Sequence, residues 1–339
     1  MASEKSMQEN DMMNGRVLSV RGDELILARG AKLLRSFDGG ISWKLWKKLP
    51  VGFFRSLLMR IPILARLLRL GVHHLAHIDE TTVVIANKEC FLVDNEKVEP
   101  VGALAGSRPM ALCAGEGQIY YGEYRSNPER SPVHIYGFDF RDKAWRPVWA
   151  FKGVRHVHGV FFDPYRKSFW VTTGDTNEEV GIWRSDDQFQ TLVKVAGGSQ
   201  QFRAVQLLFT EDYVYFGSDA PSEPNYLYRM DREGKRVEQL ARVGGSVFYG
   251  CRVGQALVFS TAVEPSEVNN RPFAEVWVSV DGLNWTKLRE FKKDILPLKY
   301  FQYGQVLFPT ICATSKDVLY CTPFATKGHG KTLILKLDN

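Results

Sequence analysis

The sequence lacks the segments that mark a secreted protein. Residues 1–14 are polar and mixed in charge, without the apolar run that a signal peptide needs. The five cysteines are odd in number and scattered, and no Cys-x-x-Cys pair occurs. This usage favours buried free thiols in a reducing compartment. We therefore expect residues 1–14 to be a disordered leader and the protein to be cytoplasmic.

The sequence also lacks a strong excess of positive or negative charge. Its 44 Lys and Arg residues stand against 38 Asp and Glu residues, which gives a formal net charge of +6. This is a mild bias toward anionic partners, and it falls far short of the charge expected for a nucleic-acid-binding surface. We therefore expect no nucleic-acid partner.

Acidic residues are absent from residues 51–72, which also show no strand-like alternation. The segment combines apolar side chains with four arginines, and these charges argue against a helix that spans a membrane. Pro62 should kink or divide a helix here. Two interpretations stay open: a short amphipathic helical insertion packed on the rest of the fold, or an interfacial helix that makes the protein peripheral at an anionic membrane surface.

Elsewhere the chain is rich in strand-length runs that alternate with turns. Residues 157–196 show the repeat best, with four such runs separated by an Asp-Pro turn, a polar loop and an Asp turn. The Asp residues that mark the third turn of each repeat are Asp38, Asp94, Asp139, Asp187, Asp231, Asp281 and Asp338. Repeats of roughly 40–50 residues with four strands each are typical of propeller blades. The sequence therefore predicts an all-β fold, a single seven-bladed β-propeller over residues 15–339, with six blades as the runner-up.

The last repeat ends after its third strand. An unpaired sheet edge is a liability for a soluble protein. We therefore expect an N-terminal strand near residues 16–20 to supply the missing outer strand and close the ring.

Residues 36–43 read Ser-Phe-Asp-Gly-Gly-Ile-Ser-Trp, and residues 279–285 carry a copy that is one residue shorter. Asp38 can accept backbone N–H bonds inside a tight turn, and Gly39 and Gly40 allow positive φ. The motif resembles the Asp-box, or BNR repeat, of the sialidase-like β-propeller superfamily. This resemblance implies that the turns lie on the face away from an active site. It also implies arginines around the central channel that hold a substrate carboxylate.

The candidate site residues follow from blade topology. In an up-and-down blade, the loops between the second and third strands share one face with the links between blades, opposite the Asp turns. The candidate catalytic residues in these loops and links are His156, His158, Asp175, Glu123, Asp219, Glu264, Tyr249 and Tyr303. The candidate substrate-binding residues are Arg108, Arg125, Arg155, Arg203, Gln200, Gln201 and Gln302.

These arginines and histidines each allow more than one interpretation. The arginines either pair with acidic loop residues such as Glu123 and Asp175, or bind a carboxylate or sulfate on a sugar. His156 and His158 are two strand positions apart, so both imidazoles should point to the same side. They are a structural pair, a general acid/base or, with Asp175 or Gln200, a divalent metal site. We expect no cofactor, and a divalent metal at His156 and His158 is the alternative.

The leading functional prediction is an enzyme that acts on an acidic oligo- or polysaccharide in a polar central channel. It would be a glycoside hydrolase or a polysaccharide lyase, since some propeller-fold lyases are similar in placing His and Tyr around an Arg. The alternative is a non-catalytic propeller that binds a glycan or a protein, associates with a membrane and belongs to a glycan assembly pathway.

Overall fold

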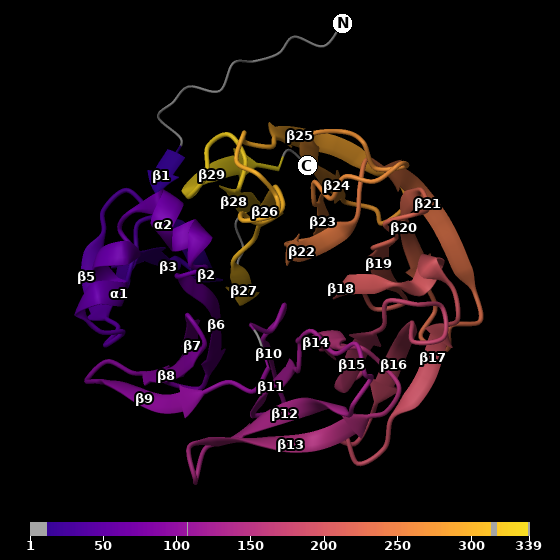
Figure 1. Cartoon of the computed structure of the whole chain (residues 1–339), viewed down its shortest axis with the longest axis horizontal. Helices are drawn as coiled ribbons and strands as arrows, with labels where there is room; N and C mark the ends of the chain where they lie inside the picture. Colours follow the sequence, from indigo (N-terminus) through magenta and orange to yellow (C-terminus); the bar gives the residue numbers. More distant parts are fainter. Residues whose placement is uncertain (1–11, 107, 313–316, 338–339) are drawn as a thin grey trace, which may run out of the picture.

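Seven β-sheets are arranged as blades around one axis in the computed structural model, which describes residues 12–106, 108–312 and 317–337 (Figure 1). The chain passes through the blades in order, and the colours of Figure 1 follow it around the ring. The predicted all-β, seven-bladed propeller is confirmed, and six blades are excluded.

Five blades consist of four consecutive strands, with the first strand nearest the axis. Blade 2 is β6 (Val72–Ile78), β7 (Thr81–Ala86), β8 (Glu89–Val93) and β9 (Val98–Ala103). Blade 3 is β10 (Cys113–Gly115), β11 (Gln118–Gly122), β12 (Val133–Asp139) and β13 (Ala144–Phe151). Blade 4 is β14 (Val157–Asp163), β15 (Ser168–Thr173), β16 (Gly181–Ser185) and β17 (Val193–Gly197). Blade 5 is β18 (Ala204–Phe209), β19 (Val214–Ser218), β20 (Asn225–Met230) and β21 (Val237–Val243). Blade 6 is β22 (Val247–Val253), β23 (Ala256–Thr261), β24 (Phe273–Ser279) and β25 (Thr286–Lys292).

The two ends of the chain build blades 1 and 7 together. Blade 1 is β2 (Arg16–Arg21), β3 (Glu24–Arg29), β4 (Lys32–Ser36) and β5 (Lys44–Lys48), with β27 (Thr310–Cys312) added parallel to β2. Blade 7 is β26 (Gln305–Leu307), β28 (Val318–Phe324), β29 (Lys331–Lys336) and β1 (Met12–Asn14).

The ring closes through β1, which pairs antiparallel with β29. The prediction that residues 16–20 supply this outer strand is wrong, because they form β2, an inner strand of blade 1. Met12–Asn14, which the sequence assigned to a disordered leader, are therefore part of the fold. Residues 1–11 lie outside the described residues.

The core lies between neighbouring blades, because both faces of an inner strand are covered. β15, for example, has six buried residues in a row, with Trp170 at its centre. One cluster joins Trp170 and Phe161 of blade 4 to Leu207 and Phe216 of blade 5. Strands buried on both faces carry continuous rather than alternating apolar runs. The packing of blade on blade fixes where each inner strand begins, and the candidate site depends on those positions.

The third turn of the blade carries the repeated Asp. The Asp38 carboxylate accepts bonds from the backbone N–H of Ser42 at 2.9 and 3.1 Å, and Gly39 and Gly40 have φ of 74° and 92°. Five further markers occupy the same turn, and Asp338 lies outside the described residues. These turns and the first turns of the blades define the lower face. The loops between second and third strands and the links between blades define the upper face.

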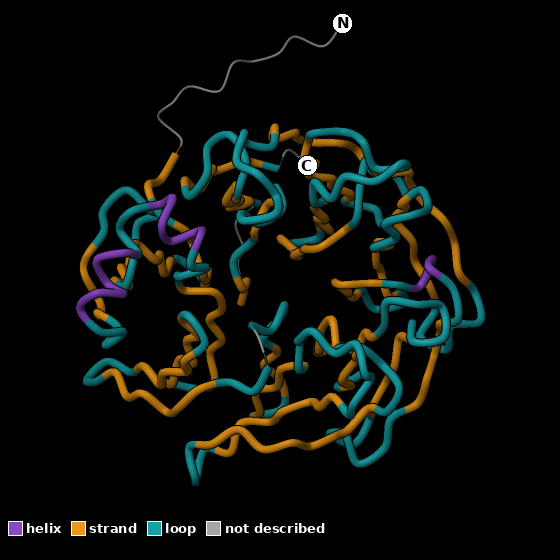
Figure 2. The backbone as a smooth tube through the Cα atoms, in the orientation of Figure 1, coloured by secondary structure: helices purple, strands orange, loops and turns teal. Residues whose placement is uncertain are grey.

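The insertion between β5 and β6 forms two short helices, α1 (Phe53–Leu58) and α2 (Pro62–Leu67), which lie over blade 1 (Figure 2). Pro62 begins α2 and divides the segment as expected. Arg66 is buried and forms an ion pair with Asp294 at 2.5 Å. In the part of the chain that the structure describes, no helix has the length and hydropathy needed to span a bilayer.

Candidate functional site

The site lies on the upper face, where blades 4, 5 and 6 begin their inner strands. His156 and His158 stand at the start of β14, which has a β-bulge between Val157 and Gly159. A bulge re-aims the side chains beside it, and both imidazoles are buried and face each other, with 3.1 Å between their Nε2 atoms. The expectation that they point to the same side is confirmed.

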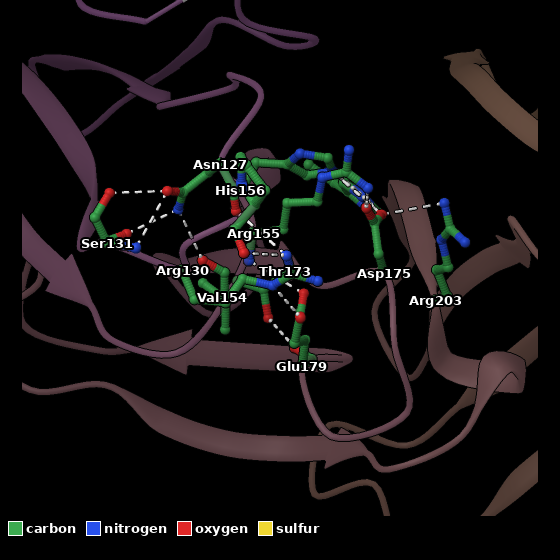
Figure 3. Close-up of polar contacts among 12 residues, drawn as sticks. Asn127, Arg130, Ser131, Val154, Arg155, His156, Thr173, Asp175, Glu179 and Arg203 are labelled. Atoms are coloured by element: carbon green, nitrogen blue, oxygen red, sulfur yellow. Dashed lines mark hydrogen bonds and ion pairs between the residues drawn. The ribbon is translucent and has the colours of Figure 1, made fainter.

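Asp175, in the loop between β15 and β16, is the residue on which this group converges (Figure 3). Its Oδ1 lies 3.3 Å from His156 Nε2 and 3.5 Å from His158 Nε2. Two guanidinium groups flank the same carboxylate, Arg155 at 3.0 Å from Oδ2 and Arg203 at 3.2 Å from Oδ1. Three loops of two blades thus deliver five ionisable groups to one point.

A second carboxyl extends the network toward blade 6. Asp219 follows β19 and lies 3.3 Å from Arg203 Nε through its Oδ2. Its neighbours Ser246 and Glu264, from the start of β22 and the loop after β23, contact each other at 3.2 Å. Tyr303 lies in the link to blade 7. Burial raises the pKa of Tyr303, and the nearby charge of Glu264 raises it further.

Several atoms of this group make no hydrogen bond within the described residues. They are Asp175 Oδ1, Asp219 Oδ1, Arg155 Nε and Arg203 Nε. Across the described ranges, Asp175 Oδ1 and Arg203 Nε have only the ion-pair contacts of 3.2–3.5 Å given above, so the group keeps hydrogen-bonding capacity for a ligand or a solvent molecule. Beside them is a pocket of about 370 Å³, and Asp175, Gln200, Arg203 and Glu223 belong to its lining.

Burial and neighbouring charges move the pKa values of the two aspartates in opposite directions. Burial raises the pKa of Asp175, but contacts with His156 and His158 and the charge of Arg203 outweigh it and leave the pKa well below its usual range. Burial raises the pKa of Asp219 to about 7, against the lowering effect of Arg203 and with a further rise from Glu264. Burial also lowers the pKa of His158. One permanently ionised carboxylate therefore lies beside a carboxyl that can exchange its proton near neutral pH.

The predicted arginines divide into paired and unpaired ones. Arg155 and Arg203 are paired with Asp175, and Arg125 with Glu123 at 2.8 Å. This matches the ion-pairing alternative given above. Arg108 has no carboxylate partner among the described residues. Its Nη1 donates to Arg69 O at 2.6 Å and lies 3.3 Å from His73 Nε2, and burial lowers its pKa to about 10.

Two predicted residues lie apart from this group. Glu123 is held by Arg125 and by His134 at 3.0 Å, as a structural pair within blade 3. Gln302 donates to Arg66 O at 3.2 Å and so attaches the insertion. By contrast, Gln200 and Gln201 lie near the site, in a short 3₁₀ helix, Gln200–Phe202, directly before Arg203.

Sequence reasoning missed two residues on this face. Arg16 begins β2, its Nε has no hydrogen bond among the described residues, and burial lowers its pKa to about 10. It lies near Tyr249, whose own pKa is raised by burial and lowered by the Arg16 charge. Tyr124 follows β11 and stacks on His156 with 4.2 Å between ring centroids. Assigning Arg16 to a closing strand hid its equivalence to Arg203, which also stands where an inner strand starts.

His156, His158 and Asp175 also offer the geometry of a metal site. One ligand atom from each lies within 4.8 Å of the other two. The arrangement can therefore hold a divalent cation, share a proton, or bind a polar ligand directly.

No family model matches the chain, and no curated protein matches it in sequence. Similar solved structures are diverse propellers. YCF48 bound to D1 peptide has 12% identity and a TM-score of 0.58, covering 96% of this chain and 94% of that one. A chain of the Mitotic Checkpoint Complex has 10% identity and a TM-score of 0.58, covering 100% and 98%. A chain of the Nidogen/Laminin Complex has 11% identity and a TM-score of 0.53, covering 83% and 95%. These likenesses show a β-propeller fold and do not single out the sialidases.

Proposed function

We propose that the upper face binds an acidic oligosaccharide and that the Asp175–Asp219 network acts on it by proton transfer, as in glycoside hydrolysis or β-elimination. The observation that carries this proposal is the convergence of incompletely hydrogen-bonded charged groups from blades 4 and 5 beside one pocket. Perturbed ionisable groups gathered in a pocket are candidates for function.

Charge supports an anionic ligand. Arg16 and Arg108 have no carboxylate partner within the described residues, and burial lowers the pKa of each. A buried guanidinium without a counter-ion gains most from a ligand carboxylate or sulfate, which it can bind in a bidentate way. Because these arginines and the Asp175 group come from different blades of one face, a ligand of several sugar units is required to contact both.

Proton transfer is assigned to Asp219. A general acid or base is most effective when its pKa lies near the working pH, and the pKa of Asp219 is raised to about 7. Arg203 connects it to the ionised Asp175, so the two carboxyls have separate roles. His156 and His158 position Asp175 from the other side.

The test is a binding and turnover screen with oligosaccharides of uronic and sialic acids, using wild type, Arg108→Ala and Asp219→Asn. Loss of the unpaired arginine should weaken binding roughly tenfold to a hundredfold, as expected for a charge-assisted hydrogen bond. Asp219→Asn should retain binding and lose turnover. Arg236→Ala, at an 88% exposed lower-face side chain, is the matched control.

An acidic peptide belongs in the same screen, because the similar YCF48 structure was solved with a peptide bound. Binding of the peptide alone would assign the chain to the non-catalytic class. If the wild type binds no acidic saccharide, the enzyme proposal is wrong.

We also propose that the insertion attaches the protein to an anionic membrane, at the cytoplasmic face that the free cysteines favour. Seven large apolar side chains of the insertion are between 41% and 78% exposed. They are Phe53, Phe54, Leu57, Ile61, Ile63, Leu67 and Leu68. Only a few of its side chains, Val51 and Met59 among them, pack into the core. So large an exposed apolar patch marks an interaction site.

The basic residues around the patch favour a lipid surface over a protein as its partner. A pocket of about 370 Å³ beside α1 has Lys48 and Arg60 in its lining, together with Phe53 and Leu57. No acidic residue occurs from Gly39 to Ile78. Apolar side chains flanked by cations fit acyl chains and anionic headgroups.

The insertion lies on the same face as the candidate site. Ala31, in the upper-face loop of blade 1, accepts a bond from Leu49 N at 2.9 Å, and Arg69 O accepts one from Arg108. A chain docked through α1 and α2 therefore turns the candidate site toward the membrane. This supports a ligand carried at the membrane surface, as glycan assembly requires.

Co-sedimentation with vesicles of phosphatidylcholine alone and with added phosphatidylserine tests the attachment. Phe53→Ser with Phe54→Ser should abolish binding. Lys48→Glu with Arg60→Glu should reduce it by at least about tenfold on the anionic vesicles only, since each basic residue near the surface contributes about 1 kcal/mol. Arg236→Glu on the lower face is the matched charge reversal. Equal binding to both vesicle types would overturn the preference for anionic lipid, and absence of binding to either would point to a protein partner instead.

A further inference from the structure

We propose that His156, His158 and Asp175 form a binding site for one divalent transition-metal ion. The site shares Asp175, His156 and His158 with the saccharide proposal, but it rests on the geometry of these three side chains and can be tested without any saccharide. No cofactor was predicted from the sequence, and a metal at the two histidines was left as the alternative.

The first argument is the spacing of the three ligand atoms. His156 Nε2, His158 Nε2 and Asp175 Oδ1 form a triangle with sides of 3.1, 3.3 and 3.5 Å. Ligand atoms at about 2.0–2.1 Å from a tetrahedral zinc ion lie about 3.3 Å from one another. The triangle therefore has the size of one face of a metal coordination shell, with the remaining positions open to a ligand or water.

The second argument is the tautomer of His158. Its Nδ1 lies 3.0 Å from the carbonyl oxygen of Ala204, which can only accept, so Nδ1 carries the proton. The neutral ring then presents the lone pair of Nε2 to Asp175 Oδ1 at 3.5 Å, an oxygen that Arg203 Nη2 also contacts at 3.2 Å. His156 Nε2 lies 3.1 Å from this lone pair and 3.3 Å from Asp175 Oδ1, so either its proton or a metal ion occupies the place between the three atoms. A backbone carbonyl on the far nitrogen is also the usual orientation device for a metal-binding histidine.

The third argument is that all three side chains are held in place without the ion. His156 stacks on Tyr124, with ring centroids 4.2 Å apart. Arg155 and Arg203 hold the Asp175 carboxylate from its outer side. His156 is 6% exposed and His158 is 2% exposed, so bulk water has little access to either ring. A site fixed in this way loses little conformational entropy when a metal binds.

Ligand chemistry limits the identity of the ion. Two imidazoles and one carboxylate suit zinc, iron, cobalt or manganese, and are a poor set for calcium, which prefers oxygen ligands. With Arg155 and Arg203 beside it, a divalent ion would leave the site strongly positive. The open coordination positions would then favour an anionic ligand.

The full chain, stripped of metal by a chelator, is titrated with Zn²⁺ alone and with Co²⁺ alone. We expect one ion bound per chain, visible absorption bands of low-symmetry Co²⁺, and an X-ray absorption spectrum of the zinc form that shows two imidazoles. Asp175→Asn and His158→Gln should each weaken Zn²⁺ binding by at least a hundredfold. His134→Gln, which breaks the His134–Glu123 contact outside the site, should leave Zn²⁺ affinity unchanged.

Circular dichroism checks that each variant is folded. The X-ray absorption spectrum needs no variant, so the proposal stays testable if a substitution disrupts blade 4. Absence of stoichiometric Zn²⁺ and Co²⁺ binding by the wild type, or a zinc spectrum without imidazole, would show that the triangle shares a proton instead. Binding that survives both Asp175→Asn and His158→Gln would place the ion elsewhere and overturn the assignment.

Discussion

Two buried Asp–Arg pairs, one on each face of the propeller, use the same residue types in different ways. On the lower face, Arg232 donates to Asp163 at 2.6 Å, to Glu211 O at 2.8 Å and to Thr210 O at 2.5 Å. On the upper face, Arg203 lies 3.3 Å from Asp219, and neither its Nε nor Asp219 Oδ1 makes a hydrogen bond within the described residues. The hydrogen bonds of the lower pair are satisfied, and those of the upper pair are satisfied only in part.

The difference shows that the two pairs differ in how completely their hydrogen bonds are satisfied. A buried charge is tolerated when its hydrogen bonds are satisfied, and it is costly when they are not. Asp163 is fully buried and also accepts a bond from Tyr165 N at 3.0 Å. The lower pair joins blades 4 and 5, whereas the upper pair leaves polar atoms open to the ligand proposed above.

The largest effect is expected from breaking the lower pair. Arg232→Ala leaves Asp163 buried without its counter-ion, and removal of one partner of a buried pair typically costs about 3–5 kcal/mol. Urea unfolding monitored by tryptophan fluorescence measures this loss. Arg236→Ala, which removes an exposed partner of Asp231 in the same turn, is the control and should change little. A loss below about 1 kcal/mol for Arg232→Ala would remove the contrast between the two faces.

The upper pair should reveal itself through pH. Because the pKa of Asp219 is raised to about 7 by burial, the folded state binds a proton that the unfolded state releases near pH 4. The protonated Asp219 therefore makes its full contribution to the free energy of unfolding below about pH 4, and this contribution is lost as the pH rises toward 7. Arg203, Glu264 and Asp175 are the charged groups that act on it.

Asp219→Asn should abolish this part of the pH dependence, because an amide does not titrate. The difference in free energy of unfolding between wild type and variant should change by roughly 3–4 kcal/mol between pH 4 and pH 8. Denaturation curves at a series of pH values provide the measurement. A difference that does not vary with pH would show that Asp219 is ionised throughout, and its assignment as the proton-transfer group would fail.

The sequence predicts the architecture well because the signal is periodic. Six of the seven Asp markers lie in the expected turn, and blade topology then places His156, Asp175, Arg203 and Asp219 on one face. The prediction failed at ring closure, because Met12–Asn14 form a strand of three residues, which is too short to give an alternating pattern. The same error hid Arg16 at the start of an inner strand.

Pairing within the site could not be predicted from the sequence. Arg125 and Arg203 both lie in upper-face segments, yet one is held by Glu123 of its own loop and the other by carboxyls of two blades. The β-bulge after Val157 sets the direction of the His158 side chain, and no residue type in the sequence predicts this bulge. Such distances depend on how neighbouring blades pack, which is a property of the whole ring.

The smallest effect concerns the serine that opens the Asp turns of the lower face. Ser36 and Ser185 are buried, and their Oγ atoms accept bonds from Gly40 N at 2.9 Å and Phe189 N at 2.8 Å. Ser279, in the turn that is one residue shorter, donates to Asp281 at 3.0 Å, and its Oγ accepts no backbone N–H bond among the described residues. The extra residue of the longer turn brings a backbone N–H back over the serine.

Ser36→Ala and Ser185→Ala should therefore each cost about 1 kcal/mol, the usual net value of a hydrogen bond, and Ser279→Ala should cost less. Urea unfolding of the three variants at one pH makes the comparison, with ligand binding on the upper face as the control that should not change. An equal loss in all three would show that the serine acts only by orienting the Asp carboxylate. In that case the backbone bond would contribute nothing measurable to these turns.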